Sequence, residues 1–168
     1  MKITDRIDIE KLNAGEILTF SGEIIVMRDA AQKRISELLS KKEEIPVNLN
    51  NKIIFYAGPA KPPKNSEIGA IGPTTSERMD KYLEMLFNLG VIATVGKGKR
   101  SNSAVEFCKN YKRVYFITPS GAAAYLSKTV EDIKIIAFSD LGTEAIHKIQ
   151  VKNFPLMVGI DSKGNQIF

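Results

Sequence analysis

After residue 50, short apolar runs alternate with stretches whose apolar residues recur at helical spacing. Strands separated by helices in this way are typical of a largely parallel sheet with helices packed on it. The sequence therefore predicts an α/β fold with a central mixed, largely parallel sheet. An earlier apolar run, broken at Ser21-Gly22, predicts either two strands or one bent strand, placed in the same sheet or in a second one. The expected strands cover residues 16–27, 52–57, 91–95, 113–118, 133–138 and 154–160, and residues 1–15 hold a candidate short strand.

Residues 72–80 read Gly-Pro-Thr-Thr-Ser-Glu-Arg-Met-Asp and join a turn to a helical pattern. The helix is expected to start near Thr74 or Thr75, with its first amides unpaired and directed outward. Arg78 lies four residues after Thr74, so both side chains are expected on one face of the first turn. Hydroxyls, amides and a guanidinium together favour a carboxylate or phosphate site. Thr74 and Glu77 also fit a capping box, which needs no ligand, and both interpretations stay open.

Two further cations are expected where strands end. Arg28 lies at a strand-to-helix junction, and Lys97 follows a predicted strand between Gly96 and Gly98. Flanking glycines let a backbone approach a ligand closely, although the spacing does not fit a P-loop. Each cation also has a simpler interpretation, as a solvated arginine at the end of an element and as a flexible basic turn. Because ligands gather at the carboxyl ends of strands in open α/β sheets, these two cations and Arg78 together favour a small polyanion.

A long connection, residues 58–71, precedes the 72–80 stretch. It contains three prolines and few apolar residues. Loops of this length are uncommon in a compact domain unless they bind a ligand or cover a site. We therefore expect one of these two roles for residues 58–71.

Composition limits the kind of site that the chain can build. One cysteine and one histidine exclude an internal disulfide framework and a self-contained zinc or iron–sulfur centre. Cys108 is expected on an apolar helix face, and His147 as a surface or packing residue. The net charge is +5, but the basic residues are interleaved with acidic ones, and no RNA-binding aromatic motif occurs. A nucleic-acid partner is therefore not expected. The length of 168 residues fits one domain, 1–168.

The sequence also carries expectations about location. No signal peptide is visible at the start, and no apolar run approaches the roughly 18 residues of a membrane span. A single cysteine favours a reducing compartment. We therefore expect a cytoplasmic protein without a membrane partner.

Several longer motifs occur in a fixed order along nearly the whole chain. They resemble the C-terminal domain of the iron–sulfur-dependent (class I) fumarases, which in many prokaryotes is a separate beta subunit. The L(+)-tartrate dehydratase beta subunit is similar in the same motifs. Besides residues 72–80, the motifs are Arg28-Asp29-Ala30-Ala31-x-Lys33-Arg34, Gly96-Lys97-Gly98, Ser120-Gly121-Ala122-Ala123-Ala124, Asp140-Leu141-Gly142-Thr143-Glu144-Ala145 and Asn153-Phe154-Pro155.

The resemblance implies a swivelling β/β/α domain that completes the active site of a partner alpha subunit, in an α2β2 assembly. The cysteines of that partner would hold a [4Fe-4S] cluster, one iron of which acts as a Lewis acid toward a dicarboxylate substrate. By position, the family's substrate-binding residues fall on Arg28, Arg78 and Lys97, and the proposed base falls on Thr74. No metal ligand is implied in this chain. Gln32 and Ser120 depart from the family pattern, at positions where a histidine and a glycine are common.

The implied reaction is the reversible hydration of fumarate to L-malate. Two arginines and a lysine suit a dianion, and they would stabilise the negative charge that develops when the C3 proton leaves. A threonine base needs an activating group, which in the family is a carboxylate of the partner chain. Two alternatives remain: an L(+)-tartrate dehydratase that uses the same residues, and a non-catalytic anion-binding or assembly module.

Overall fold

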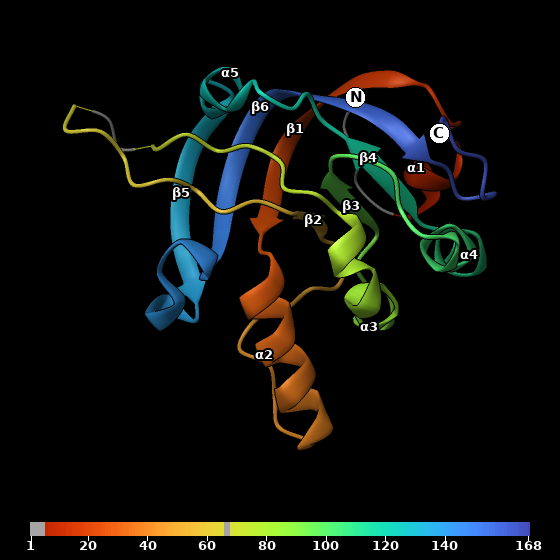
Figure 1. Cartoon of the computed structure of the whole chain (residues 1–168), viewed down its shortest axis with the longest axis horizontal. Coiled ribbons are helices and arrows are strands. Elements are labelled where there is room, and N and C mark those ends of the chain that lie inside the picture. Colours follow the sequence, from red (N-terminus) through yellow and green to blue (C-terminus); the bar gives the residue numbers. More distant parts are fainter. Residues whose placement is uncertain (1–5, 66–67) are drawn as a thin grey trace.

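The computed structural model describes residues 6–65 and 68–168, and its sheet closes on itself (Figure 1). The strand order is β1-β2-β3-β4-β6-β5, and β1 pairs in addition with β6. Five strands, β1, β2, β3, β4 and β6, therefore form a ring. The sixth strand, β5, is not part of the ring and, among the described strands, pairs with β6 alone. The strands are β1 (Ile17–Val26), β2 (Ile53–Phe55), β3 (Ala93–Gly96), β4 (Val114–Ile117), β5 (Val130–Ala137) and β6 (Ile146–Ile160).

The closing strand is β6, which has 15 residues and pairs antiparallel with β1, β4 and β5. The pairings β1–β2, β2–β3 and β3–β4 are parallel. The expected mixed sheet is thus confirmed, but an open and largely parallel sheet is not what forms. The parallel part of the sheet ends at β4, because the next strand beside it, β6, runs antiparallel. Since β6 is long enough to pair with both β4 and β1, it joins the first and last of the parallel strands.

Side chains that alternate along the strands supply two apolar cores. One core lies inside the ring and includes Val26, Phe55, Val95 and Phe116, with Phe55 and Phe154 in edge-to-face contact at 5.4 Å. The neighbouring residues along the same strands face outward and pack against the helices. The helical elements are α1 (Arg6–Glu10), α2 (Asp29–Ser40), η1 (Glu77–Tyr82), α3 (Leu83–Asn88), α4 (Asn102–Tyr111), α5 (Ala123–Ser127) and η2 (Ser139–Glu144).

Local expectations for the first part of the chain are partly corrected. The apolar run before Met27 is one strand, β1, with a register irregularity between Phe20 and Gly22. The candidate strand within residues 1–15 is wrong over residues 6–10, which form α1, and its remainder at residues 1–5 lies outside the described residues. Cys108 is buried on α4 and His147 is 7% exposed, so both are packing residues as expected. Across the described ranges, no helix is long and apolar enough to cross a membrane.

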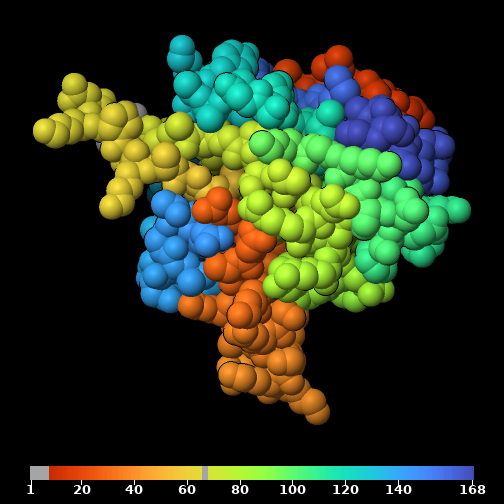
Figure 2. Space-filling model, viewed as in Figure 1, coloured from red at the N-terminus to blue at the C-terminus, as the bar shows by residue number. Residues whose placement is uncertain are grey.

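The described parts of the connection, residues 58–65 and 68–71, project beyond β5 as two limbs, drawn in yellow in Figure 1 and standing out from the body in Figure 2. Its limbs are joined by a bond from the amide of Ala60 to the carbonyl of Ala70, 2.9 Å long. Beneath it lies a largely apolar cleft of about 300 Å³, bordered by Ile133 and Ile135 of β5 and by His147. Part of the loop therefore borders a cleft, and its expected role in binding a ligand or covering a site stays a prediction.

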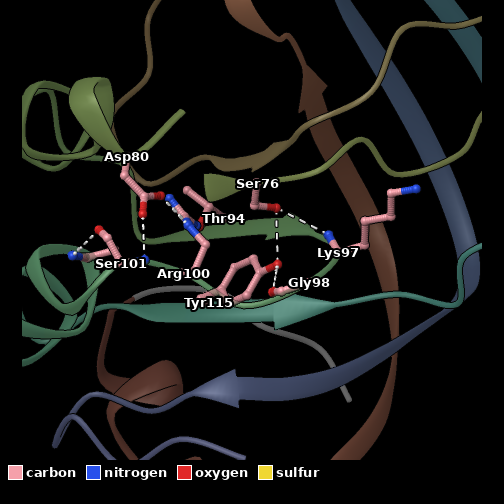
Figure 3. A network of polar contacts seen from close by, with 9 residues as sticks. Ser76, Asp80, Thr94, Lys97, Gly98, Arg100, Ser101 and Tyr115 are labelled. Atoms are coloured by element: carbon pink, nitrogen blue, oxygen red, sulfur yellow. Dashed lines mark hydrogen bonds and ion pairs between the residues drawn. The ribbon is translucent and has the colours of Figure 1, made fainter. Parts of the chain in front are cut away.

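A buried polar layer separates the outward face of β2, β3 and β4 from the helices (Figure 3). Arg100 is its centre and is 1% exposed. Its Nε donates to Asp80, and its guanidinium lies 4.7 Å from the ring centre of Tyr115 and 5.4 Å from that of Tyr56. Asp80 also accepts from the amide of Ser101 at 2.8 Å, so the buried carboxylate ties η1 to the start of α4. The buried cation is therefore paired, as burial requires.

The Arg100–Asp80 pair yields a stability prediction. Asp80→Asn removes the charge that compensates Arg100, and an uncompensated buried charge costs about 3–5 kcal/mol. The matched control is Asp140→Asn, because Asp140 pairs with Arg34 at the surface, where its side chain is 66% exposed. Urea unfolding should show a large loss of stability for the first variant and little change for the second. Equal stabilities for the two variants would contradict this account of the layer.

His147 yields a prediction on pH. Burial lowers the pKa of the imidazole below its ordinary value of 6.5, and a bond between Nδ1 and the carbonyl of Ala145 offsets this only in part. The unfolded chain therefore binds a proton more readily, so this contribution to stability is complete above about pH 6.5 and is lost as the pH falls. Urea unfolding of wild type and His147→Gln at several pH values measures it. The stability difference between the two proteins should fall on acidification, whereas a constant difference would refute the assignment.

Candidate functional site

Arg28 lies directly after β1 and precedes α2. Its Nε is 3.2 Å from Oε1 of Glu144, at the end of η2, which is an ion-pair distance without hydrogen-bond alignment. The guanidinium also lies close against Gly58, because a Cβ at that position would be 2.9 Å from Cζ of Arg28. The end of β1, the segment after β2 and η2 therefore meet around one cation, whose side chain is 30% exposed.

Arg78 lies on the same side of the molecule as Arg28. Its Nε donates to both carboxylate oxygens of Asp29, at 3.1 and 3.0 Å, and Asp29 is the residue that follows Arg28. Its Nη2 donates to Oγ1 of Thr74 at 2.7 Å. The expected contact between Thr74 and Arg78 is thus present, and the two arginines belong to one surface.

Thr74 does not start a helix, so the expected helix boundary is wrong. The helix begins as the 3₁₀ turn η1 at Glu77, with Ser76 preceding it and making no side-chain cap. The reason is that the chain before η1 is held by strand ends: the amide of Thr74 donates to Tyr56 at 2.8 Å and that of Ser76 to Lys97 at 3.2 Å. These two amides are therefore used within the fold. The capping box is wrong as well, since Oγ1 of Thr74 accepts from Arg78 instead.

Lys97 follows β3 directly and pairs with Thr75 in an isolated parallel bridge. Within residues 6–65 and 68–168 its ammonium forms no ion pair, and its side chain extends away from Ser76 (Figure 3). It borders a cleft of about 410 Å³ whose other walls come from the end of β4 and the residues after it, the start of β1, and residues 155–157 of β6. Arg28, Thr74 and Arg78 are not among the residues that line this cleft, so Lys97 connects it to the arginine surface through the Thr75 bridge.

Two carboxylates in this surface were not found from the sequence as partners of the arginines. Asp29 and Glu144 appear in the sequence analysis only as members of longer motifs, without a role of their own. Each lies beside the Nε of an arginine, and in the part of the chain that the structure describes Nη1 of Arg78 has no hydrogen-bond partner. The terminal edge of a guanidinium fits a carboxylate in two parallel bonds. The arrangement can therefore hold an anion with the arginines already in place.

The surface is open toward solvent. The side chains of Arg78 and Asp29 are 47% and 39% exposed, and Glu144 is 33% exposed. Strong binding of an anion needs further walls that exclude water, because exposed ion pairs are screened by water and salt. Arg28, Thr74 and Arg78 thus lie together on an open surface, and Lys97 borders a separate cleft beside it. Their roles as site residues stay predictions.

The described residues also do not fit an iron–sulfur cluster. Among them, no group of three or more histidine, cysteine, aspartate or glutamate side chains is placed to hold a metal ion. The thiol of Cys108 is buried, and burial raises its pKa to about 12, which opposes the thiolate that a cluster needs. Gln32, at a position that departs from the family pattern, is completely buried. Its side-chain amide atoms, Nε2 and Oε1, have no hydrogen-bond partner within the described ranges.

Comparison with known proteins gives relatives that match this chain over 90% or more of its length. Fumarate hydratase class I, anaerobic, of Escherichia coli K12 is 37% identical over 153 residues, which are 90% of this chain and 28% of the relative. Fumarate hydratase 2 of Leishmania major is 35% identical over 97% of this chain and 29% of its own length. The chain thus spans less than a third of these fumarate hydratases. The L(+)-tartrate dehydratase subunit beta of Escherichia coli K12 is 35% identical, over 95% of this chain and 81% of the relative.

The family described as "Fumarase C-terminus" matches residues 2–168. This range contains all the motifs of the sequence analysis, including the four residues gathered at the rim where β1, β2 and β3 end. With a match of this extent, and with relatives of both kinds above 30% identity, the chain belongs to the fumarase C-terminus family.

Proposed function

We propose that this chain is the beta subunit of an iron–sulfur hydro-lyase that interconverts fumarate and L-malate. The observation that carries the proposal is the position of Arg28, Thr74 and Arg78 on one surface, with Lys97 joined to the same segment by the Thr75 bridge. These residues come from three separate parts of the chain.

In this proposal the cations bind the substrate's carboxylates. The Nε of Arg28 and of Arg78 lies beside a carboxylate of this chain, and Nη2 of Arg78 also donates to Thr74. In this proposal the terminal nitrogens of Arg28 and Nη1 of Arg78 bind the ligand. Lys97 adds a point charge at the edge nearest Thr75. When the proton at C3 leaves, negative charge grows on the adjacent carboxylate, and fixed cations stabilise that charge more than they stabilise the substrate.

Thr74 is proposed as the group that takes the C3 proton. It accepts a hydrogen bond from Arg78 at 2.7 Å, and a cation beside the hydroxyl oxygen stabilises negative charge on it. Because Thr74 does not cap a helix, its oxygen is not committed to the backbone. Its own proton still needs an acceptor, which in this proposal is a carboxylate of the partner chain.

The partner is an alpha subunit that carries a [4Fe-4S] cluster. Two observations support a partner. The proposed site is open to solvent, and this chain matches 81% of the length of a relative that is named as a beta subunit. The described residues do not fit a cluster, so we derive no step from this chain through it. We further propose that residues 1–168 are one domain of the swivelling β/β/α type, that the assembly is α2β2, and that it works in the cytoplasm, where a lone buried thiol stays reduced.

L(+)-tartrate dehydratase remains a second candidate, because the relative with that name matches this chain along most of its own length, whereas the fumarate hydratases match in under a third of theirs. The same cations serve either dicarboxylate. The two candidates differ in what the assembled enzyme turns over, so comparing malate with L(+)-tartrate as substrate decides between them.

The first test is reconstitution. The chain produced alone should be folded, colourless and inactive, and hydration of fumarate should appear on anaerobic co-expression with a cluster-bearing alpha subunit from the same genome. The Arg78→Ala variant of that complex should lose about 100-fold or more in kcat/KM, because the substrate's carboxylate is left without its partner.

The matched control is Arg34→Ala. Arg34 also pairs with an aspartate, Asp140, at 2.8 Å, but it lies outside the proposed site. Its variant should keep nearly wild-type kinetics. Strong hydratase activity from the isolated chain, or equal kinetics for the Arg78 and Arg34 variants, would refute the proposal.

A further inference from the structure

Ser76 is completely buried and holds the backbone of Lys97 from both sides. Its Oγ accepts from the amide of Lys97 at 3.1 Å, and its own amide donates to the carbonyl of Lys97 at 3.2 Å. Ser76 lies between Thr74 and Arg78 in the same short segment. One residue therefore connects the proposed base and one proposed substrate arginine to the proposed substrate lysine.

Tyr115 completes this connection. Its hydroxyl lies 3.0 Å from Oγ of Ser76 and 3.0 Å from the carbonyl of Gly98 (Figure 3). A carbonyl can only accept, so the tyrosine proton goes to Gly98, and the tyrosine oxygen accepts from the hydroxyl of Ser76. The order of donation is then Lys97 amide to Ser76, Ser76 to Tyr115, and Tyr115 to Gly98. Every hydroxyl proton in this chain of bonds is used, and both residues of the turn are held.

Steric contact with the end of β3 also fixes the position of Ser76. A Cβ at Gly96 would lie 1.9 Å from Oγ of Ser76, so only glycine allows the serine to sit directly on the end of β3. Tyr115 is held in turn by Arg100, whose guanidinium lies 4.7 Å from the centre of its ring. The hydroxyl of Tyr115 is protonated at neutral pH and can donate, and burial raises its pKa further, to about 12.

We propose that Ser76, together with Tyr115, is the positioning residue that sets Lys97 at a fixed place relative to Thr74 and Arg78. This rests on the proposed function, because it takes Lys97 as a substrate-binding residue. Neither hydroxyl touches the substrate. Both act through the backbone of Lys97, and a displacement of about 1 Å at a catalytic group can cost about 100-fold in rate.

The test is a double-mutant cycle in the reconstituted complex, with fumarate hydration as the readout. Ser76→Ala and Tyr115→Phe should each lower kcat/KM by about 10-fold or more, and Lys97→Met should lower it further. If Ser76 acts through Lys97, adding Ser76→Ala to Lys97→Met should cost less than about 2-fold more, because the group it positions is gone. A merely structural effect of the serine would instead multiply with that of the lysine.

Two matched controls separate positioning from folding. Ser162→Ala removes another buried serine hydroxyl, which donates to the carbonyl of Glu10, and Tyr111→Phe removes an exposed tyrosine hydroxyl bonded to Glu84. Both control variants should keep activity within about 2-fold of wild type. Amide hydrogen exchange adds a readout that does not depend on turnover, because exchange at Lys97 should accelerate in Ser76→Ala and stay unchanged in Ser162→Ala.

The outcomes distinguish this inference from the proposed function. Wild-type activity of Lys97→Met would overturn the role of the lysine itself. Loss of activity in Lys97→Met, together with wild-type activity in folded Ser76→Ala and Tyr115→Phe, would overturn the positioning role alone. A loss from Ser76→Ala that multiplies fully with that of Lys97→Met would also overturn it.

Discussion

The pairing of one long strand with three others determines the rest of this structure. Because β6 runs antiparallel to β1, β4 and β5, it joins the ends of a parallel row into a ring. The three parallel strands β1, β2 and β3 then all end at one rim. The segments that leave this rim carry Arg28, Gly58 and Lys97, and residues 74–78 cross between them. The candidate site is thus a consequence of strand direction and ring closure.

Beneath that rim the fold uses polar packing where most domains use apolar packing. The buried layer around Arg100 includes a carboxylate, two tyrosine rings and a serine that bears on Gly96. Such a layer adds little net stability over an apolar one, but its directional bonds specify one arrangement. Its outer members are the backbone groups of Lys97 and Gly98. Directional packing therefore ends at the residues where the proposed site needs accurate placement.

The sequence predicted most of the strands, the strand-end positions of Arg28 and Lys97, and the contact between Thr74 and Arg78, because these depend on local patterns. It did not predict the first half of β6, since a strand was expected only over residues 154–160. It did not predict ring closure, which depends on pairing between β1 and the distant β6. The burial of Arg100 was not predicted, since its partner Asp80 lies in another element. The bonds of Ser76 to Lys97 and Tyr115 were not predicted either, because they join residues that are distant in the sequence. The roles of the four site residues stay predictions.

The internal carboxylates beside the two arginines affect how a ligand binds. A flexible arginine loses rotamer freedom, worth about 2 kcal/mol, when it is fixed on a ligand. Arg78, held by Asp29 and Thr74, has given up most of that freedom during folding. An incoming dianion therefore meets side chains that are already ordered, at the cost of a weaker net positive field. The surface thus favours recognition by shape and spacing over long-range attraction.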